Sequence, residues 1–397
     1  MNFRKLQDFL DNMVNTGRTP GCSVIVYKSG APVYVYSTGV SDLVSGKKME
    51  GNEFFNIYSC SKITTVTAGL QLVEKGIINL NDPLYEYIPE FRDVMLKTSD
   101  GELVKPKNPI LLGHLFSMTA GLSYDFNTPS LKKLYEDTDR QYTTAEFART
   151  LAGMPLSFEP GTKWAYSLCH DCLGGLVSII TGMPFSEYVK RNVFDPLNMT
   201  ETFYHITPDM ESRMATQYTF VPNDKEQASL TMVEAQIRGN AKDGWFKDVG
   251  IQKIGGHGSD PNFDSGGGGL TSTVHDYGKL MAALSCGGMC ATGERVLSAQ
   301  TVELMKTNRL TTPELTGNFI WKHLAGYGYG LGVRTHIDRA KSGSIARLGE
   351  FGWGGAAGAT AIMDTEEQLG AFFVQHTINP REEWYQPRLR DVVYSCI

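Results

Sequence analysis

A serine and a lysine three positions apart could supply a nucleophile and its base. At the start of a helix this Ser-x-x-Lys spacing places the hydroxyl and the amine on one face, a single helical turn apart. A lysine removed from water loses part of its preference for the charged form and can then accept the serine proton. Three pairs have this spacing: Ser45/Lys48, Ser59/Lys62 and Ser130/Lys133.

The surroundings of the three pairs favour Ser59/Lys62. Ser45 lies in a polar, turn-like segment, and Ser130 follows a Thr-Pro step in an open polar region. Ser59 instead follows the apolar run 54–58 and precedes a helix that we expect over 63–76. Both groups would lie at the helix start, partly buried. We therefore expect Lys62 to titrate below a free lysine, so that the rate rises with pH as the amine deprotonates.

Other chemistry-bearing patterns are weaker. Cys169-x-x-Cys172, with Cys286 and Cys290 as a second half, could suggest zinc or redox chemistry. However, the first pair falls on an expected helix, and we expect no metal. The run Gly266–Gly269 lacks the Lys-Ser/Thr of a phosphate loop, which favours close backbone packing. Neither a His-Glu-x-x-His nor a Gly-x-Ser-x-Gly pattern occurs.

The composition is that of a globular protein. The chain has 397 residues, of which 41% are hydrophobic and 20% charged, with a net charge of -6. This charge gives no reason to expect nucleic acid or an anionic membrane as a partner. The first residues have helical spacing interrupted by charges rather than a secretory signal, and no apolar run is long enough to span a bilayer. With an odd number of cysteines, seven, we expect a reduced, cytoplasmic protein.

The elements that must position these residues are strands at both chain ends around a helical middle. The expected strands are 21–27, 31–37, 328–333, 359–363 and 370–375, and a closing helix is expected over 384–394. These patterns predict an α/β fold in which one antiparallel sheet, built from both ends and flanked by helices, carries an inserted helical lobe. We expect residues 1–82 and 263–397 to form the α/β region. Residues 83–262 would be mostly helical, with an irregular polar excursion at 208–262, and the whole would form one catalytic unit.

Several segments together resemble the serine β-lactamase and penicillin-binding-protein superfamily, in its class C-like branch. They occur in the expected order: Tyr58-Ser-Cys-Ser-Lys62, Lys75 to Pro83, Leu111 to Leu122, Phe158 to Ser167, Ser265 to Ser272, Gly328 to Gly332 and Phe351-Gly-Trp-Gly-Gly355. The ordered set is far more specific than any one member. The resemblance implies a β-lactamase/transpeptidase-like fold and an acyl-enzyme on Ser59, with neither a metal nor another cofactor.

Tyr166 matches the second element of that family, Tyr-x-Asn. A phenol near Lys62 can exchange a proton with the nucleophile and then protonate the leaving group. Leu168 stands where the family usually has asparagine, so this segment is more similar to the β-lactamase-like (family VIII) carboxylesterases, which often read Tyr-Ser-Leu. The following His170-Asp171 is expected to be a surface pair or a helix-packing pair.

The third element of the family is a strand beside the site, here Trp353-Gly354-Gly355. Glycine lets a substrate lie close to the strand backbone. By resemblance, the N–H groups of Ser59 and Ala356 would form an oxyanion hole. Trp353 replaces the usual lysine or histidine with a flat apolar wall, and we expect it to bind substrate together with both glycines and Leu168.

These features predict a serine hydrolase, with a small-molecule ester or amide as substrate and a carboxylesterase as the favoured activity. A β-lactamase or D-alanyl peptidase, transfer of the acyl group to an alcohol, and a non-catalytic binding relative remain as alternatives. Trp353 and Leu168 cannot supply the cation and the amide that a carboxylate-bearing β-lactam needs. Arg334, just after the 328–332 segment, could supply a substitute cation.

Overall fold

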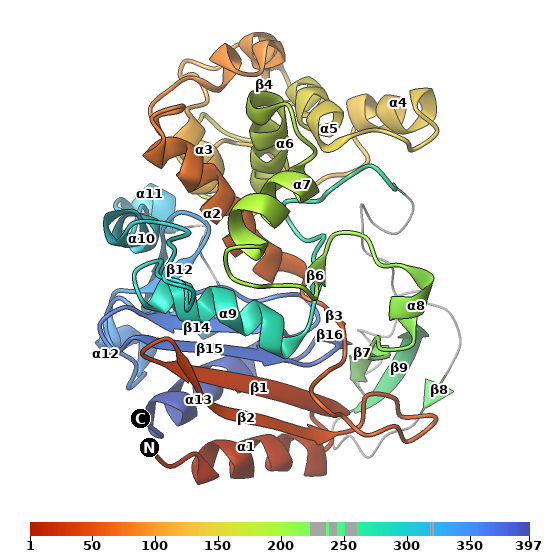
Figure 1. Cartoon of the computed structure of the whole chain (residues 1–397). Coiled ribbons are helices and arrows are strands. Elements are labelled where there is room, and N and C mark those ends of the chain that lie inside the picture. Colours follow the sequence, from red (N-terminus) through yellow and green to blue (C-terminus); the bar gives the residue numbers. More distant parts are fainter. Residues whose placement is uncertain (223–235, 238–243, 251–259, 318, 320) are drawn as a thin grey trace.

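A seven-stranded antiparallel sheet forms the base of the molecule (Figure 1). The computed structural model describes residues 1–222, 236–237, 244–250, 260–317, 319 and 321–397. In spatial order, the strands of the sheet are β11 (Tyr327–Tyr329), β12 (Arg334–His336), β13 (Phe351–Gly352), β14 (Thr360–Asp364), β15 (Leu369–Val374), β1 (Gly21–Lys28) and β2 (Ala31–Gly39). Strand β1 pairs with β15, with Ser23 opposite Val374. The expected sheet from both chain ends is therefore confirmed.

Helices cover both faces of this sheet (Figure 1). Alternate residues of β1 point to opposite sides, and Val24 and Val26 pack in one apolar cluster with α1 (Arg4–Asn15) and α13 (Glu382–Tyr394). Ile25 belongs to the other cluster, on the side covered by α9 (Val274–Ser285). A Cβ on Gly278 of α9 would lie 2.6 Å from Ile25 Cγ2, so this glycine permits the close contact between helix and sheet.

A helical lobe lies above the sheet (Figure 1), and it includes the helix 61–74, which the expected range of 83–262 leaves out. Its helices are α2 (Ser61–Glu74), α3 (Leu112–Phe116), α4 (Pro129–Asp137), α5 (Thr144–Thr150), α6 (Cys169–Thr181) and α7 (Phe185–Val189), the last continued by η5 (Lys190–Phe194). Two glycines let these helices approach closely. A Cβ on Gly175 of α6 would lie 2.2 Å from Ala148 of α5, and one on Gly69 of α2 would lie 2.7 Å from Phe116. The start of α2 is thereby fixed at the boundary between lobe and sheet.

Short elements complete the described chain. The strands are β3 (Phe55–Asn56), β4 (Leu96–Lys97), β5 (Leu103–Val104), β6 (Thr202–Phe203), β10 (Thr271–Ser272) and β16 (Thr377–Ile378). The helices are α8 (Pro208–Glu211), α10 (Ala299–Lys306), α11 (Pro313–Thr316) and α12 (Arg339–Ser342), with 3-10 turns η1 (Tyr58–Cys60), η2 (Leu84–Glu86), η3 (Pro89–Asp93), η4 (Leu151–Gly153) and η8 (Lys322–Leu324). No single helix among the described residues is long and apolar enough to cross a membrane.

Two expected elements differ from the structure. The segment 328–333 is not one strand, because a turn at 330–333, with Gly332 at φ +74°, separates β11 from β12. The expected irregular excursion contains β7 (Gln217–Pro222), β8 (Gln236–Ile237) and β9 (Gly244–Gly250), which form a small sheet with β16. Tyr218, Phe220 and Phe246 pack together in this sheet and stabilise its pairing. The remainder of the predicted excursion lies partly outside the described residues.

Candidate active site

The candidate nucleophile Ser59 lies in a strained turn at the start of α2. It is the central residue of the 3-10 turn η1, which runs directly into α2. The preceding Tyr58 has φ +45°, a left-handed conformation that is uncommon for a residue with a side chain. The Tyr58 hydroxyl donates to Gln217 Oε1 at 2.8 Å and so holds the turn against β7. This turn leaves the side chain of Ser59 at the wall of a cavity.

Lys62 and Tyr166 both reach the Ser59 hydroxyl. Lys62 is fully buried in the first turn of α2, and its Nζ donates to Ser59 Oγ at 3.2 Å. The Tyr166 hydroxyl donates to the same oxygen at 2.6 Å. Lys62 Nζ also lies 4.6 Å from the centroid of the Tyr166 ring. The structure therefore brings Tyr166, which is 107 positions from Ser59 in the sequence, to the Ser59/Lys62 pair.

The segment that carries Tyr166 has no regular structure and is held by its backbone. It precedes α6, and Ala165 N donates to Met118 O at 3.0 Å. The ring of Tyr166 stacks between Tyr124 and Trp353, at centroid distances of 5.5 Å and 5.8 Å. Trp353 Nε1 donates to the Tyr166 hydroxyl at 3.4 Å. These contacts fix the phenol oxygen toward Ser59.

The expectation of a lowered lysine pKa is wrong. Burial lowers the pKa of the Lys62 ammonium, but opposing effects outweigh it. The phenol oxygens of Tyr124 and Tyr166, followed by the carboxylate of Asp171, raise the pKa of Lys62 above that of an ordinary lysine. Sequence inspection missed this because Asp171 is distant from Lys62 along the chain. The surroundings of Lys62 therefore favour its charged form.

Asp171 is a buried carboxylate that supports the position of Lys62. It lies in the first turn of α6, is 1% exposed, and accepts hydrogen bonds from Ser265 Oγ at 2.6 Å and from Gly267 N at 3.0 Å. The carbonyl oxygen of Gly267 accepts a hydrogen bond from the ammonium group of Lys62. The backbone of one residue, Gly267, thus connects the carboxylate to the cation. His170 is also fully buried, so the expected packing pair is present and the surface alternative is wrong.

The glycine run Gly266–Gly269 packs closely against α6, as its composition indicates. A Cβ on Gly267 would lie 2.3 Å from Asp171 Oδ2, and one on Gly266 would lie 2.3 Å from His170 O. Only glycine fits at these two positions without a shift in the backbone. This run was the one sequence signal that could have located Asp171, because consecutive glycines indicate that another group lies very close.

We expect Asp171→Asn to move the acid limb of the pH profile for kcat/KM to lower pH. The Asp171 carboxylate stabilises the Lys62 ammonium, so its removal lowers the pKa of Lys62 and lets the proton leave at lower pH. A pH profile with a neutral ester measures this limb. Asp137→Asn, at an exposed carboxylate paired with Lys133, is the control and should leave the limb unchanged. A lower rate at every pH with no shift would mean that Asp171 is only structural.

The Trp353-Gly354-Gly355 segment forms the opposite wall of the site. Strand β13 ends at Gly352, and a single bridge between Gly354 and Thr360 extends the pairing toward the site. A Cβ on Gly355 would lie 2.2 Å from Ile57 O, so glycine allows this wall to approach the chain just before the nucleophile. Ala356 lines the same cavity as Ser59, and their proposed joint role as an oxyanion hole stays a prediction.

Leu168, which the sequence predicts to bind substrate, does not line the cavity beside Ser59. Its side chain is fully buried in the main apolar core, and it is absent from the described lining of the cavity. Leu168 directly precedes α6, and its backbone N–H donates to Ser123 O at 3.1 Å. This hydrogen bond ties the segment before α6 to the helical lobe. We therefore assign Leu168 to packing and not to direct substrate contact.

The cavity beside Ser59 has a volume of about 170 Å³ and an aromatic wall. Tyr166, Trp321 and Trp353 line it together, and Trp321 is 36% exposed at its edge. The Trp321 and Trp353 rings are 5.6 Å apart. The role of Trp321 was not foreseen, because the run in which it lies has no motif that indicates chemistry.

Arg334 also lines this cavity, but its charge is already balanced. It pairs with Glu350 at 2.6 Å, and both side chains are buried. Arg334 Nη1 also donates to Ala361 O at 3.2 Å. The expected substitute cation is therefore present at the site in an internal ion pair.

The cysteine pattern singled out in the sequence does not form a metal centre. Cys169 and Cys172 lie in the first turns of α6 and are buried as free thiols. Over the described ranges, no group of three or more histidine, cysteine or acidic residues could hold a metal ion. Both cysteines belong to the main apolar core.

Comparisons with known proteins find relatives over nearly the whole chain. The family model described as Beta-lactamase matches residues 6–392. An uncharacterized protein from Mycobacterium tuberculosis is 29% identical, over 95% of this chain and 90% of that protein. Esterase EstB from Burkholderia gladioli is 27% identical, over 98% of this chain and 95% of that protein. Among solved structures, the protein titled "EstCE1, a hydrolase with promiscuous acyltransferase activity" has the same fold, with a TM-score of 0.77, 24% identity and 98% coverage of both chains.

Proposed function

This chain belongs to the beta-lactamase family of serine hydrolases, and on that premise we propose that it is a carboxylesterase that forms an acyl-enzyme on Ser59. The observation that carries the proposal is the convergence of Lys62 and Tyr166 on Ser59 Oγ. A non-catalytic relative would have no need of all three groups in hydrogen-bonding contact.

In the proposed reaction, Lys62 and Tyr166 act as one proton acceptor. The pair can hold its shared proton as ammonium and phenolate or as amine and phenol, and either form can accept the proton of Ser59. The oxygen of Ser59 then attacks the ester carbonyl, and the pair returns the proton to the leaving alcohol. In the second half of the reaction, a water molecule gives a proton to the pair and its oxygen attacks the acyl carbonyl. The bond to Ser59 Oγ breaks, Ser59 regains the proton and the acid leaves. The Lys62 ammonium, which its surroundings favour over the amine, stabilises the negative charge that develops on Ser59 Oγ and Tyr166 Oη.

The cavity supports an uncharged acyl group as the substrate. Its wall of Tyr166, Trp321 and Trp353 offers apolar surface, and burial of a CH₂ group is worth about 0.8 kcal/mol. The buried pair of Arg334 with Glu350 offers no uncompensated charge to a carboxylate. For the location we propose the cytoplasm, because all seven cysteines are free thiols.

Simple esters are expected to be hydrolysed better than carboxylate-bearing β-lactams. A lysine in place of Trp353 would give the β-lactam carboxylate a charge-assisted hydrogen bond, worth about 1.5–3 kcal/mol. Its absence corresponds to a difference of roughly 10-fold to 150-fold. The measurement is kcat/KM for a short-chain p-nitrophenyl ester and for nitrocefin on one preparation. Equal values would favour the β-lactamase alternative.

A further inference from the structure

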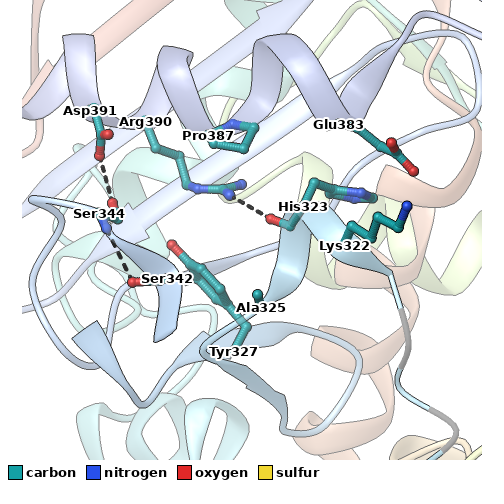
Figure 2. Close-up of a pocket in the computed structure, with 10 residues that line it drawn as sticks. All are labelled: Lys322, His323, Ala325, Tyr327, Ser342, Ser344, Glu383, Pro387, Arg390 and Asp391. Atoms are coloured by element: carbon teal, nitrogen blue, oxygen red, sulfur yellow. Dashed lines mark hydrogen bonds between the residues drawn. The ribbon is translucent and has the colours of Figure 1, made fainter. Parts of the chain in front are cut away.

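A second cavity lies beside the first, between the C-terminal helix α13 and the turn η8 (Figure 2). It has a volume of about 190 Å³. Its walls include Tyr327 of β11, Ser344 after α12, and Arg390 and Asp391 of α13. His323 lines both this cavity and the one beside Ser59, so the two are neighbours. Nothing in the proposed ester hydrolysis uses the second cavity.

Arg390 enters this cavity with most of its hydrogen-bonding capacity unused. The side chain is 1% exposed, and Nη2 donates to His323 O at 3.0 Å (Figure 2). Nε and Nη1 of the same guanidinium are buried without a hydrogen-bond partner, and so is His323 Nδ1. Buried polar atoms are nearly always paired, and each unpaired one is costly. Each unpaired N–H of a guanidinium can donate a charge-assisted hydrogen bond to a carboxylate oxygen.

The carboxylates near Arg390 make no direct ion pair with it in the described part of the chain. Glu350 forms its ion pair with the neighbouring Arg334. Asp391 accepts hydrogen bonds from Ser344 Oγ at 2.6 Å and from Ile345 N at 3.1 Å. Arg390 has no ion pair with any carboxylate in the described part of the chain. The remaining charged groups of the lining, Lys322 and Glu383, have opposite signs.

Both guanidinium groups lie near one ring. Arg390 Cζ is 4.9 Å and Arg334 Cζ is 5.6 Å from the centroid of Tyr327. Burial, followed by the charge of Arg334, lowers the pKa of Arg390, and the nearby carboxylates oppose this effect only in part. A bound anion would relieve the same positive charge and occupy the unused donors.

We propose that the cavity under α13 binds a carboxylate through the unpaired N–H groups of the Arg390 guanidinium. The carboxylate could belong to a separate small acid. It could also be the far end of an ester whose carbonyl lies at Ser59, and this second source rests on the proposed esterase function. The first source requires no catalysis, so binding to the cavity and hydrolysis at Ser59 can be tested separately.

Binding is measured first, by calorimetry on the inactive Ser59→Ala protein. Butyrate is the probe, and butyramide is the neutral ligand of the same shape. We expect butyrate to bind at least 10-fold more tightly than butyramide, and Arg390→Gln to remove this preference. Arg390→Lys should retain part of it. Arg388→Gln, at an exposed arginine of the same helix, should leave it unchanged. Equal affinity of the intact cavity for both ligands would overturn the proposal without involving any variant.

Kinetics then identify the source of the carboxylate. The active protein is compared on p-nitrophenyl butyrate and on p-nitrophenyl esters that end in a carboxylate at increasing chain length. If the carboxylate is part of the substrate, the ester of one chain length is hydrolysed best. Arg390→Gln then raises the KM for that ester roughly 10-fold to 100-fold, and the KM for p-nitrophenyl butyrate does not change. If it is a separate acid, no length is favoured, and free butyrate changes the kinetics of the neutral ester only while Arg390 is present. If the natural protein hydrolyses none of these esters but still binds butyrate more tightly than butyramide, the proposed esterase function is wrong and the carboxylate site is retained.

Discussion

Alanine in place of Ser59 is expected to abolish turnover while the protein remains folded. Ser59 Oγ is the oxygen that accepts hydrogen bonds from both Lys62 and Tyr166, and no other group at the cavity has this environment among the described residues. Loss of a nucleophile reduces kcat by about 10⁴-fold to 10⁶-fold in enzymes of this kind. The loss of one hydroxyl leaves only a small space beside Tyr166, so the melting temperature should change little.

The covalent step is measured by intact-mass spectrometry after exposure to a slowly deacylating ester. An adduct should form on the natural protein and not on Ser59→Ala. Ser45→Ala is the matched control, because Ser45 belongs to another Ser-x-x-Lys pair but is exposed and donates to Asp42 at 2.7 Å. An adduct of equal yield on the Ser59 variant would place the nucleophile elsewhere.

Methionine in place of Lys62 is expected to reduce kcat/KM by about 100-fold to 10,000-fold, the usual contribution of a general acid–base group. Methionine fills a similar volume but can neither accept the proton nor stabilise negative charge on Ser59 Oγ. It also leaves the Gly267 carbonyl and Asp171 without their cation, so thermal unfolding must be measured beside activity.

The pH profile separates the role of Lys62 in catalysis from its role in stability. In the natural protein the rate should rise with pH as Lys62 and Tyr166 together give up one of two protons and keep the one that they share. The raised pKa of Lys62 places this rise at higher pH than burial alone would. In Lys62→Met the limb should be lost. Lys133→Met, at the exposed lysine that pairs with Asp137, is the control. Near-normal acylation in Lys62→Met would show that another group takes the proton.

Local patterns predicted much of the fold. The β-branched and aromatic residues of 21–27 and the apolar run 370–375 indicated strands, and the apolar face of 63–76 indicated most of the helix that begins at Ser61 and carries Lys62. The break at 330–333 was missed because its apolar residues suit a strand, whereas the turn depends on the left-handed backbone of Gly332. A single sequence does not show where a glycine adopts that conformation.

At the site, order along the chain identified the residues but not their electrostatic environment. The convergence of Ser59, Lys62 and Tyr166 follows the expected motifs. Asp171 and the burial of Leu168 could not be read from these motifs, because both depend on how α6 packs against the glycine run and the core. The pairing of Arg334 with Glu350 likewise requires β12 and the segment before β13 to lie side by side.

The pairing of β1 with β15 also has a consequence for biosynthesis. Ser23 lies opposite Val374, so the two partners leave the ribosome about 350 residues apart. At about 5–20 residues per second, β1 waits roughly 20–70 s for its neighbour. During that time the hairpin of β1 and β2 exposes an unpaired edge and apolar side chains such as Val24 and Val26, which are buried in the finished protein. The nascent chain is therefore vulnerable to aggregation for most of its synthesis, and its dependence on chaperones should be greatest before the last strands emerge.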